Sequence, residues 1–271
     1  MVKKKFSYYI IIFSLFGLMY LNGACSSKSN ITEIKVAISG DFFPFIYTEK
    51  DVLHGLEIEL LNHLEKVLKI PVIITKYNFS EKLEKLQNEE YDIALGGVTI
   101  TEYRSEIFDF SKPYYDATQT ILATLDSSIV IDSLDNIANY RIGVLNNSTS
   151  LLFLEHNFLQ ERKMSVDNIK KFQSLQDMFL ALENNDISLM LLENSIAKLT
   201  KYKILYKHDL IEHYAIVFKK SADTVGSAFS RYDTGTSSGR LSLIKKHVNK
   251  ALEKILESSE WEHLKRKSFI I

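Results

Sequence analysis

Arg104 is the side chain of this sequence best suited to bind a small anion. It lies in the stretch YDIALGGVTITEYRSEIFDFSKPYY, residues 91–115, where an apolar run ends at two glycines before a short helix-like segment. Its planar guanidinium matches a carboxylate with two parallel hydrogen bonds, which a lysine ammonium cannot do. The alternative is a surface arginine that pairs with Glu102 or Glu106 of the same short helix.

The residues just before Arg104 add donors and space for a ligand. Thr101 is placed to cap the short helix, which leaves backbone N–H groups pointing toward the same region. Thr99 supplies a hydroxyl, and Gly96 and Gly97 allow a ligand to approach the backbone because they have no side chain. The stretch therefore favours a site for a small anion in front of Arg104.

Composition places the chain among ordinary globular proteins. Its 271 residues are 46% hydrophobic and 25% charged, with a formal net charge of −1. This balance, without long blocks of like charge, argues against nucleic-acid binding. The sequence lacks phosphate-binding, zinc-protease and serine-hydrolase motifs, and its 7 histidines are scattered. We therefore expect neither a cofactor nor a metal site.

The N-terminus has the features of a secretory signal peptide, which we assign to residues 1–24. Lys3, Lys4 and Lys5 precede an apolar stretch at 6–21, and small residues follow it. The apolar stretch is short for a membrane span, although an uncleaved membrane anchor is the alternative.

Cys25 is the only cysteine, so no intramolecular disulfide can form. Its position, after small residues and before the polar segment SSKSN, resembles that of the lipidated cysteine of bacterial lipoproteins. The resemblance implies diacylglycerol on the sulfur, a lipid-attached linker over 25–32 and anchoring at a membrane surface. Lipoproteins usually have leucine three residues before the cysteine. Here Asn22 has that place, and Leu21 lies one residue further away.

Strand-like and helix-like segments alternate along the rest of the chain, as in parallel sheets flanked by helices. The expected strands cover residues 34–38, 72–77, 91–98, 119–125, 140–145, 187–192 and 214–218. The expected helices cover residues 55–69, 79–87, 150–159, 174–184, 241–258 and 260–267. The stretch RYDTGTSSGR at 231–240 is expected to be a flexible surface loop. Two successive α/β units predict two lobes.

From about residue 34 to 269 the chain resembles the family 3 extracellular solute-binding proteins, the amino-acid receptors of bacterial ABC importers. The resemblance rests on an ordered set of motifs: GDFFPFIY (40–47), GLEIEL (55–60), YDIALGGVTITEYR (91–104), FDFSKPYY (108–115), RIGVLNNST (141–149), ISLMLLEN (187–194) and VNKALEKI (248–255). It implies that Gly97, Thr99 and Arg104 bind the backbone groups of the ligand.

Two aromatic residues match those that enclose the ligand side chain in the family. Phe42 lies two residues before Pro44 in the first strand–helix loop, and Phe79 lies at the start of the second helix. Aromatic faces suit apolar or cationic side chains. The alternative is that both are core residues, as we expect for Phe43 and Phe45.

Ser148 and Thr149 stand where the family commonly has a Gly-Thr-Thr-like turn. The resemblance implies that they donate to the ligand carboxylate. Asn147 replaces the usual glycine, and asparagine tolerates the left-handed backbone better than most residues. The alternative is an ordinary Ser/Thr cap at a helix start.

Glu193 follows the buried run ISLMLL, where the family has an aspartate that pairs with the ligand ammonium. Glutamate keeps the charge and is one methylene longer. The alternatives are a surface glutamate or a general acid, as in the periplasmic cyclohexadienyl (prephenate/arogenate) dehydratases of the same fold, whose GD-aromatic-x-PF-x-Y spacing occurs at 40–47. A ligand-sensing receptor component is a further alternative.

The resemblance implies an α/β fold of two lobes, the type 2 periplasmic-binding-protein fold, with a ligand cleft between lobes joined by two hinge strands. We expect the first lobe to cover 33–121 and 216–271, and the second to cover 122–215. The expected function is non-catalytic binding of a small amino acid at the cell envelope, by a monomer that delivers it to a membrane permease. Ser39 lies near the place where receptors for basic amino acids have an acid, which disfavours lysine and arginine, although Asp41 nearby leaves this open.

Overall fold

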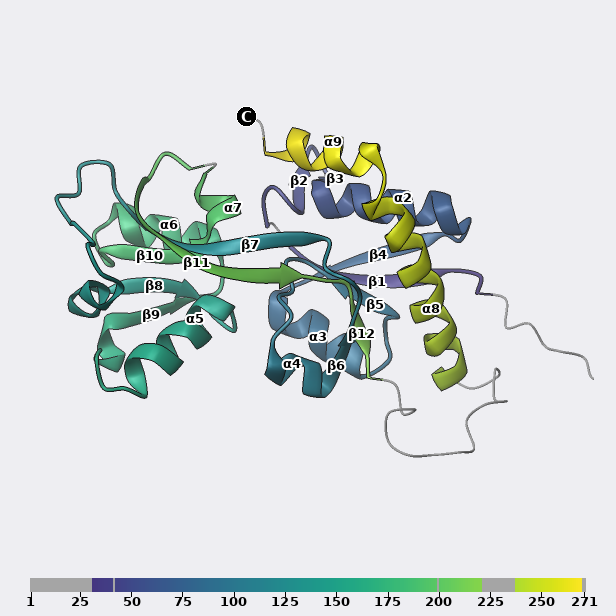
Figure 1. The fold of residues 1–271 in the computed structure, drawn as a ribbon, viewed down its shortest axis with the longest axis horizontal. Helices are drawn as coiled ribbons and strands as arrows, with labels where there is room; N and C mark the ends of the chain where they lie inside the picture. The colour runs from purple at the N-terminus through teal and green to yellow at the C-terminus, as the bar shows by residue number, and fades with distance from the viewer. Residues whose placement is uncertain (1–30, 41, 199, 221–236, 270–271) are drawn as a thin grey trace, which may run out of the picture.

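The computed structural model describes residues 31–40, 42–198, 200–220 and 237–269. They form two α/β lobes, each built on one five-stranded sheet, that lie side by side (Figure 1). The predicted two-lobe architecture is confirmed. The predicted signal peptide and Cys25 lie outside the described residues. Within the described part of the chain, no helix combines the length and the apolar character that a membrane span requires.

The sheet of the first lobe has the strand order β4-β1-β5-β12-β6. Its strands are β1 (Ile34–Ser39), β4 (Val72–Tyr77), β5 (Ile93–Leu95), β6 (Phe108–Phe110) and β12 (Val217–Lys219). β1 runs parallel to β4 and β5, whereas β12 is antiparallel to β5 and β6. A small antiparallel hairpin, β2 (Tyr47–Glu49) and β3 (Val52–His54), follows the first loop.

Helices cover both faces of this sheet (Figure 1). They are α2 (Leu56–Leu68), α3 (Phe79–Gln87), α4 (Glu102–Ile107), α8 (Ser237–Leu256) and α9 (Ser259–Ser268). Val36 and Ile38 of β1 pack in the cluster on the α2, α8 and α9 side, while Ala37 packs in the cluster on the opposite side. Residues 36–38 of β1 are therefore buried on both faces, which explains why they are all apolar.

The sheet of the second lobe has the strand order β11-β7-β10-β8-β9. Its strands are β7 (Tyr115–Ala123), β8 (Ile142–Leu145), β9 (Ile169–Phe172), β10 (Leu189–Glu193) and β11 (Lys203–Tyr214). The helical segments are η1 (Leu134–Asn139), α5 (Thr149–Leu154), η2 (Glu155–Leu159), η3 (Val166–Asn168), α6 (Leu175–Glu183) and α7 (Asn194–Ala197). Leu189 and Leu191 pack on one face of β10, and Met190 and Leu192 on the other.

The antiparallel strands β7 and β11 run between the lobes (Figure 1). Tyr115 and Tyr214 pair at the end of this ribbon, next to the first lobe. The backbone of Tyr214 also bridges to Thr99, in the loop after β5. The predicted lobe limits, after residues 121 and 215, fall inside β7 and just past β11.

Several local features differ from the sequence-based expectations, including β2, β3 and β6, for which no strand was expected. The helix expected over 150–159 is α5 followed by the π-helix η2. β9 and most of β11 were not expected, because their charged residues obscure the apolar pattern. The loop expected over 231–240 is wrong for its last four residues, which open α8; residues 231–236 lie outside the described chain. Arg240 holds this first part of α8 through a two-point ion pair with Asp92.

Candidate ligand-binding site

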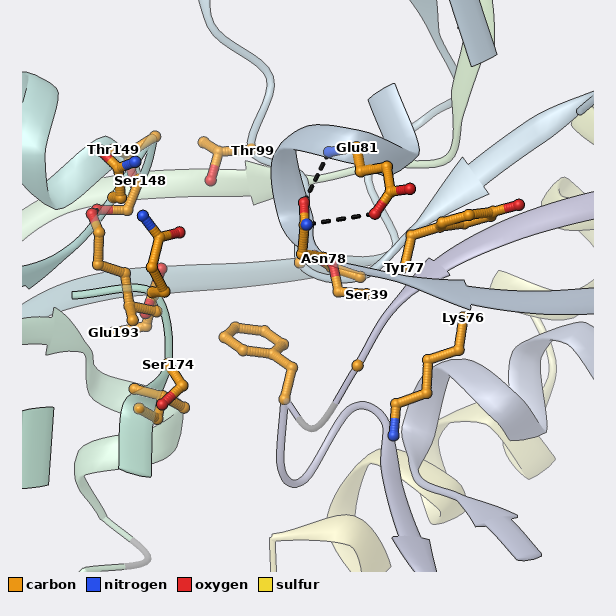
Figure 2. A pocket seen from close by; sticks show the side chains of 18 of the residues that line it. Ser39, Lys76, Tyr77, Asn78, Glu81, Thr99, Ser148, Thr149, Ser174 and Glu193 are labelled. Atoms are coloured by element: carbon orange, nitrogen blue, oxygen red, sulfur yellow. Dashed lines mark hydrogen bonds between the residues drawn. The ribbon is translucent and has the colours of Figure 1, made fainter. Parts of the chain in front are cut away.

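A cavity of about 500 Å³ lies between the two lobes. Figure 2 shows Ser148, Thr149, Ser174 and Glu193 on one side of it, and Ser39, Asn78 and Glu81 on the other. The predicted site residues Phe42, Gly97, Thr99, Arg104, Ser148, Thr149 and Glu193 all line this cavity. Phe79, the remaining predicted residue, is the first residue of α3, and its side chain is outside the described part of the structure.

Arg104 is buried at the contact between the lobes. Its side chain is only 7% exposed, so the alternative of a surface arginine is wrong. Its Nη1 donates to the Thr99 carbonyl at 2.9 Å, and its Nη2 donates to the Asn147 carbonyl of the second lobe at 3.2 Å. Burial lowers the pKa of Arg104, and the charges of Glu212 and Glu193 oppose that shift. The guanidinium therefore remains a cation directed at the cleft.

Thr101 and Gly97 shape the loop around Arg104. The Thr101 hydroxyl accepts from the Arg104 N–H at 3.2 Å, which is the predicted helix cap. Gly97 has φ 60°, and a Cβ there would lie 2.4 Å from Cε1 of Phe42. Only glycine allows both this left-handed backbone and this close contact.

A carboxylate that sequence reasoning missed joins the two lobes. Glu212, on β11, accepts from the Thr99 hydroxyl at 3.2 Å, from the Thr149 hydroxyl at 2.9 Å and from Gln119 Nε2 at 2.9 Å. Thr99 belongs to the first lobe, Thr149 begins α5 of the second, and Gln119 lies on the other hinge strand. Glu212 thus holds both threonine hydroxyls at the edge of the cleft. In the structure Glu212 and Tyr214 are buried and His213 is exposed, but the charged residues of β11 give the sequence no apolar alternation that would have revealed this.

Ser148 serves as the cap of α5. Its hydroxyl donates to the Leu145 carbonyl at 2.7 Å and accepts from the Leu151 N–H at 3.2 Å. This is the ordinary capping geometry considered as the alternative for this turn. Asn147 has φ 57°, so asparagine does adopt the left-handed conformation at the position where the family commonly has glycine.

Glu193 is the last residue of β10 and is 7% exposed, so the alternative of a surface glutamate is wrong. Burial raises the pKa of Glu193 to about 7, and the nearby charge of Glu212 adds to the shift. The charge of Arg104 and the neighbouring Tyr214 hydroxyl act in the opposite direction. A cation placed beside Glu193 would lower its pKa and favour the ionised form.

Phe42 lines the cleft and packs against apolar residues of both lobes. Its ring stacks on that of Phe45, with centroids 5.2 Å apart. Phe45 is a fully buried core residue, as expected. The expectation that Phe43 is core is wrong, because Phe43 is 38% exposed; its ring packs edge-on against that of Tyr47 in the hairpin.

A further buried carboxylate lies beneath the glycines. Glu57, on α2, is fully buried and accepts from the Gly97 N–H at 2.8 Å and from the Tyr114 hydroxyl at 2.6 Å. Burial raises the pKa of Glu57, against the effect of these hydrogen bonds and of the nearby Lys82. Among the residues that the structure describes, no group of three or more His, Cys, Asp and Glu side chains is arranged to hold a metal ion.

The structure has two α/β lobes with a cavity between them that is lined by polar and charged side chains. Residues 34–270 match the family of bacterial extracellular solute-binding proteins, family 3. The chain belongs to this family, which confirms the resemblance drawn from its motifs. The family consists of extracellular proteins, which supports the predicted location of this chain outside the cytoplasmic membrane.

Similar proteins with curated names are amino-acid-binding proteins. The chain is 25% identical over 247 residues to a probable histidine-binding protein of Neisseria gonorrhoeae, covering 87% of this chain and 82% of the relative. It is 26% identical over 249 residues to the arginine-binding extracellular protein ArtP of Bacillus subtilis, covering 90% and 88%.

Solved structures share the fold. The arginine-, lysine-, histidine-binding protein ArtJ of Geobacillus stearothermophilus superposes with a TM-score of 0.72 at 23% identity, covering 88% of this chain and 95% of that one. An ancestral amino-acid-binding protein, a precursor of cyclohexadienyl dehydratase, gives a TM-score of 0.72 at 20% identity, covering 95% and 99%.

Proposed function

We propose that this protein binds a free α-amino acid between its lobes and delivers it to the membrane permease of an ABC importer. The observation that carries the proposal is that a buried arginine of one lobe and a buried carboxylate of the other line the same cleft. A zwitterion needs both charges, because an unpaired buried charge is strongly unfavourable. Arg104 and Glu193 supply them.

Each predicted residue has a role in this proposal. Arg104 binds the ligand carboxylate, with the Thr99 and Thr149 hydroxyls beside it, and the Gly97 carbonyl and Glu193 accept from the ammonium. Ser148 caps α5 and so stabilises the turn of the second lobe that lines the cleft. Phe42 and Phe79 enclose the ligand side chain. The ligand carboxylate competes with the Asn147 carbonyl for Arg104, and a charged acceptor makes the stronger bond.

The protein is further proposed to act while attached to a membrane. Cleavage after residue 24 leaves Cys25 as the lipid-bearing N-terminus, and residues 25–32 connect it to the first lobe. A monomer on a short tether stays near its permease. The relatives named as components of amino-acid transport support the delivery step.

Binding without catalysis is the main proposal, and the dehydratase remains the second candidate. The observation that favours a dehydratase is the carboxyl of Glu193, whose pKa burial raises to about 7, since a general acid must be protonated near neutral pH. In the receptor, an ammonium beside Glu193 keeps it ionised. The names of the relatives, which are binding proteins, favour the receptor.

A thermal-shift screen of residues 25–271 against the common amino acids tests the function. A ligand at 100 times its Kd stabilises the fold by roughly 2.7 kcal/mol, which is readily measured. We expect one or a few amino acids to give this shift, and no aromatic product from prephenate or arogenate. A folded protein that none of the amino acids stabilises would overturn the proposal, and release of an aromatic product would favour the dehydratase.

A further inference from the structure

Ser39 occupies the side of the cleft away from Glu193 and Thr149 (Figure 2). It is the last residue of β1, and it is buried while still lining the cavity. Asn78 and Glu81, at the start of α3, lie on the same side. If Arg104 and Glu193 bind the carboxylate and the ammonium of an amino acid, the side chain of that amino acid extends toward Ser39, Asn78 and Glu81.

Lys82 lies directly behind Ser39 and is 0% exposed. Its Nζ donates to the Ser39 hydroxyl and, at 2.9 Å, to the Gly96 carbonyl. Lysine is almost never fully buried without such partners. Burial lowers the pKa of Lys82 to about 7, while the charge of Glu57 opposes the shift. Both the ammonium and the neutral amine donate hydrogen bonds, so the contact with Ser39 persists in either form.

The bond from Lys82 fixes how Ser39 faces the cleft. A serine hydroxyl has one proton to donate. The Ser39 oxygen accepts from Lys82, so its proton is not used in that bond. The Gly96 carbonyl, 3.5 Å from the Ser39 oxygen, is only a weak acceptor for this proton. Ser39 therefore presents a donor to the cleft, with a buried lysine behind it.

Two carboxylates lie near this side of the cleft. Glu57 is fully buried beneath the floor, where its Oε1 accepts from the Gly97 N–H and the Tyr114 hydroxyl. Glu81 accepts from the side chain of Asn78 at 3.2 Å, at the rim. Among the described residues, a cationic ligand side chain at the floor would thus meet a donor and a buried lysine, while the carboxylate that lines this side of the cavity, Glu81, lies at the rim.

We propose that Ser39 and Lys82 select an amino acid whose side chain ends in a hydrogen-bond-accepting oxygen, a carboxamide or a carboxylate. The inference rests on the proposed function and gives it a ligand class. A guanidinium, ammonium or imidazolium side chain is disfavoured. This chain then differs in ligand from its arginine- and histidine-binding relatives.

Calorimetric titration of residues 25–271 with glutamine, asparagine, glutamate, aspartate, arginine, lysine and histidine tests the class. We expect at least a tenfold higher affinity for one of the first four than for any of the last three. Comparison of amides with acids then separates the two oxygen-bearing groups. Tightest binding of arginine, lysine or histidine would overturn this inference and leave the proposed function standing. Binding of no amino acid at all would overturn the proposed function itself.

Two variants test the residues. Lys82→Met keeps the length of the side chain and removes the donor, and Ser39→Ala removes the hydroxyl and keeps the lysine. Each should lower the affinity for the preferred ligand at least tenfold while changing that for alanine, whose side chain does not reach Ser39, by less than threefold. Lys85→Met, on the same helix but paired with Glu90 at the surface, is the matched control and should change neither.

The comparison with alanine separates a role in specificity from a role in folding. A variant that only loosens the fold would weaken both ligands equally, and this would overturn the inference. If Lys82→Met does not fold, Ser39→Ala decides alone, because it removes a single oxygen. Ser39→Asp provides an opposite change, since a carboxylate at this position should reduce the preference for oxygen-bearing side chains over arginine at least tenfold.

Discussion

The Glu212 carboxylate accepts a hydrogen bond from the Thr149 hydroxyl at 2.9 Å, so a hinge strand holds the first residue of α5. Thr99 and Gln119 donate to the same carboxylate. The contact thus connects both lobes through one side chain that lies at the edge of the cleft. Its removal leaves three buried donors without their acceptor, which carries a desolvation penalty.

Glu212→Ala should lower the free energy of unfolding by about 1–3 kcal/mol, because buried donors lose a charged acceptor. Glu212→Gln should have a smaller effect, since an amide oxygen still accepts one of the bonds. Urea unfolding followed by circular dichroism measures both variants. Asp209→Ala, at an exposed position of the same strand, is the control and should change stability by less than about 0.5 kcal/mol. Equal effects of Glu212→Ala and Asp209→Ala would contradict the bridging role.

Arg104→Ala should abolish amino-acid binding while the protein stays folded. A buried ligand carboxylate without its partner costs about 2–5 kcal/mol in binding free energy. Arg104→Lys should also bind poorly, because a point charge does not reproduce the two parallel bonds of the guanidinium. Calorimetry measures the affinities, with Arg141→Ala, at the exposed residue just before β8, as the control. Unchanged affinity in Arg104→Ala would reject the carboxylate role.

Glu193 should make stability depend on pH. Its pKa is raised from 4.5 to about 7, so between these values the folded state holds a proton that the unfolded state has lost. The contribution of Glu193 to stability is therefore neutral below pH 4.5 and becomes unfavourable as pH rises toward 7, by up to about 3 kcal/mol. Relative to the parent, Glu193→Gln should become more stable over this range. Parallel pH–stability curves for the two proteins would refute the shift.

The same residue should make binding depend on pH in the opposite direction. The ligand ammonium requires the ionised carboxylate, so affinity should rise from pH 6 to pH 8 in the parent. Glu193→Gln should bind at least tenfold more weakly at pH 8 and lose most of this pH dependence. Calorimetry at several pH values measures both effects. Intact binding by Glu193→Gln, with loss of a measurable turnover of prephenate, would instead identify a dehydratase.

Cys25→Ser should release the protein from membranes. Lipidation requires the cysteine sulfur, and two or more acyl chains are needed for stable anchoring. Fractionation of cells that produce the parent or the variant measures the distribution between membrane and soluble protein. Ser26→Ala, the neighbouring change, should leave the distribution as it is. Equal partitioning of parent and Cys25→Ser would remove the lipoprotein interpretation.

The sequence predicted the parts of the site that depend on short, ordered motifs. Arg104, Thr99 and Gly97 lie within one loop and one short helix, so their spacing alone places them together. Glu193 ends a continuous apolar strand, and the resemblance to the family's aspartate at that position predicted its place in the cleft. The local pattern alone left surface positions open for Arg104 and Glu193, whereas the two-lobe fold followed from the alternation of strands and helices.

Glu212 and Lys82 show where this reasoning stops. Glu212 lies on β11, whose charged residues hide its strand pattern, and its partners are 63 and 113 residues away in sequence. Lys82 lies in a helix that reads as an ordinary amphipathic surface helix, and its burial depends on contacts with β1 and the Gly96 loop. A sequence pattern indicates whether a segment is a helix or a strand more readily than it indicates which of its side chains contacts another element.

The two backbone carbonyls that hold Arg104 have a consequence for affinity. The Thr99 and Asn147 carbonyls keep the guanidinium oriented and largely out of water. When a ligand carboxylate replaces one of these neutral acceptors, the Arg104 guanidinium has already lost most of its hydration and of its rotamer freedom on folding. This is preorganisation, and it shifts the penalty of binding from the moment of capture to the folding of the chain.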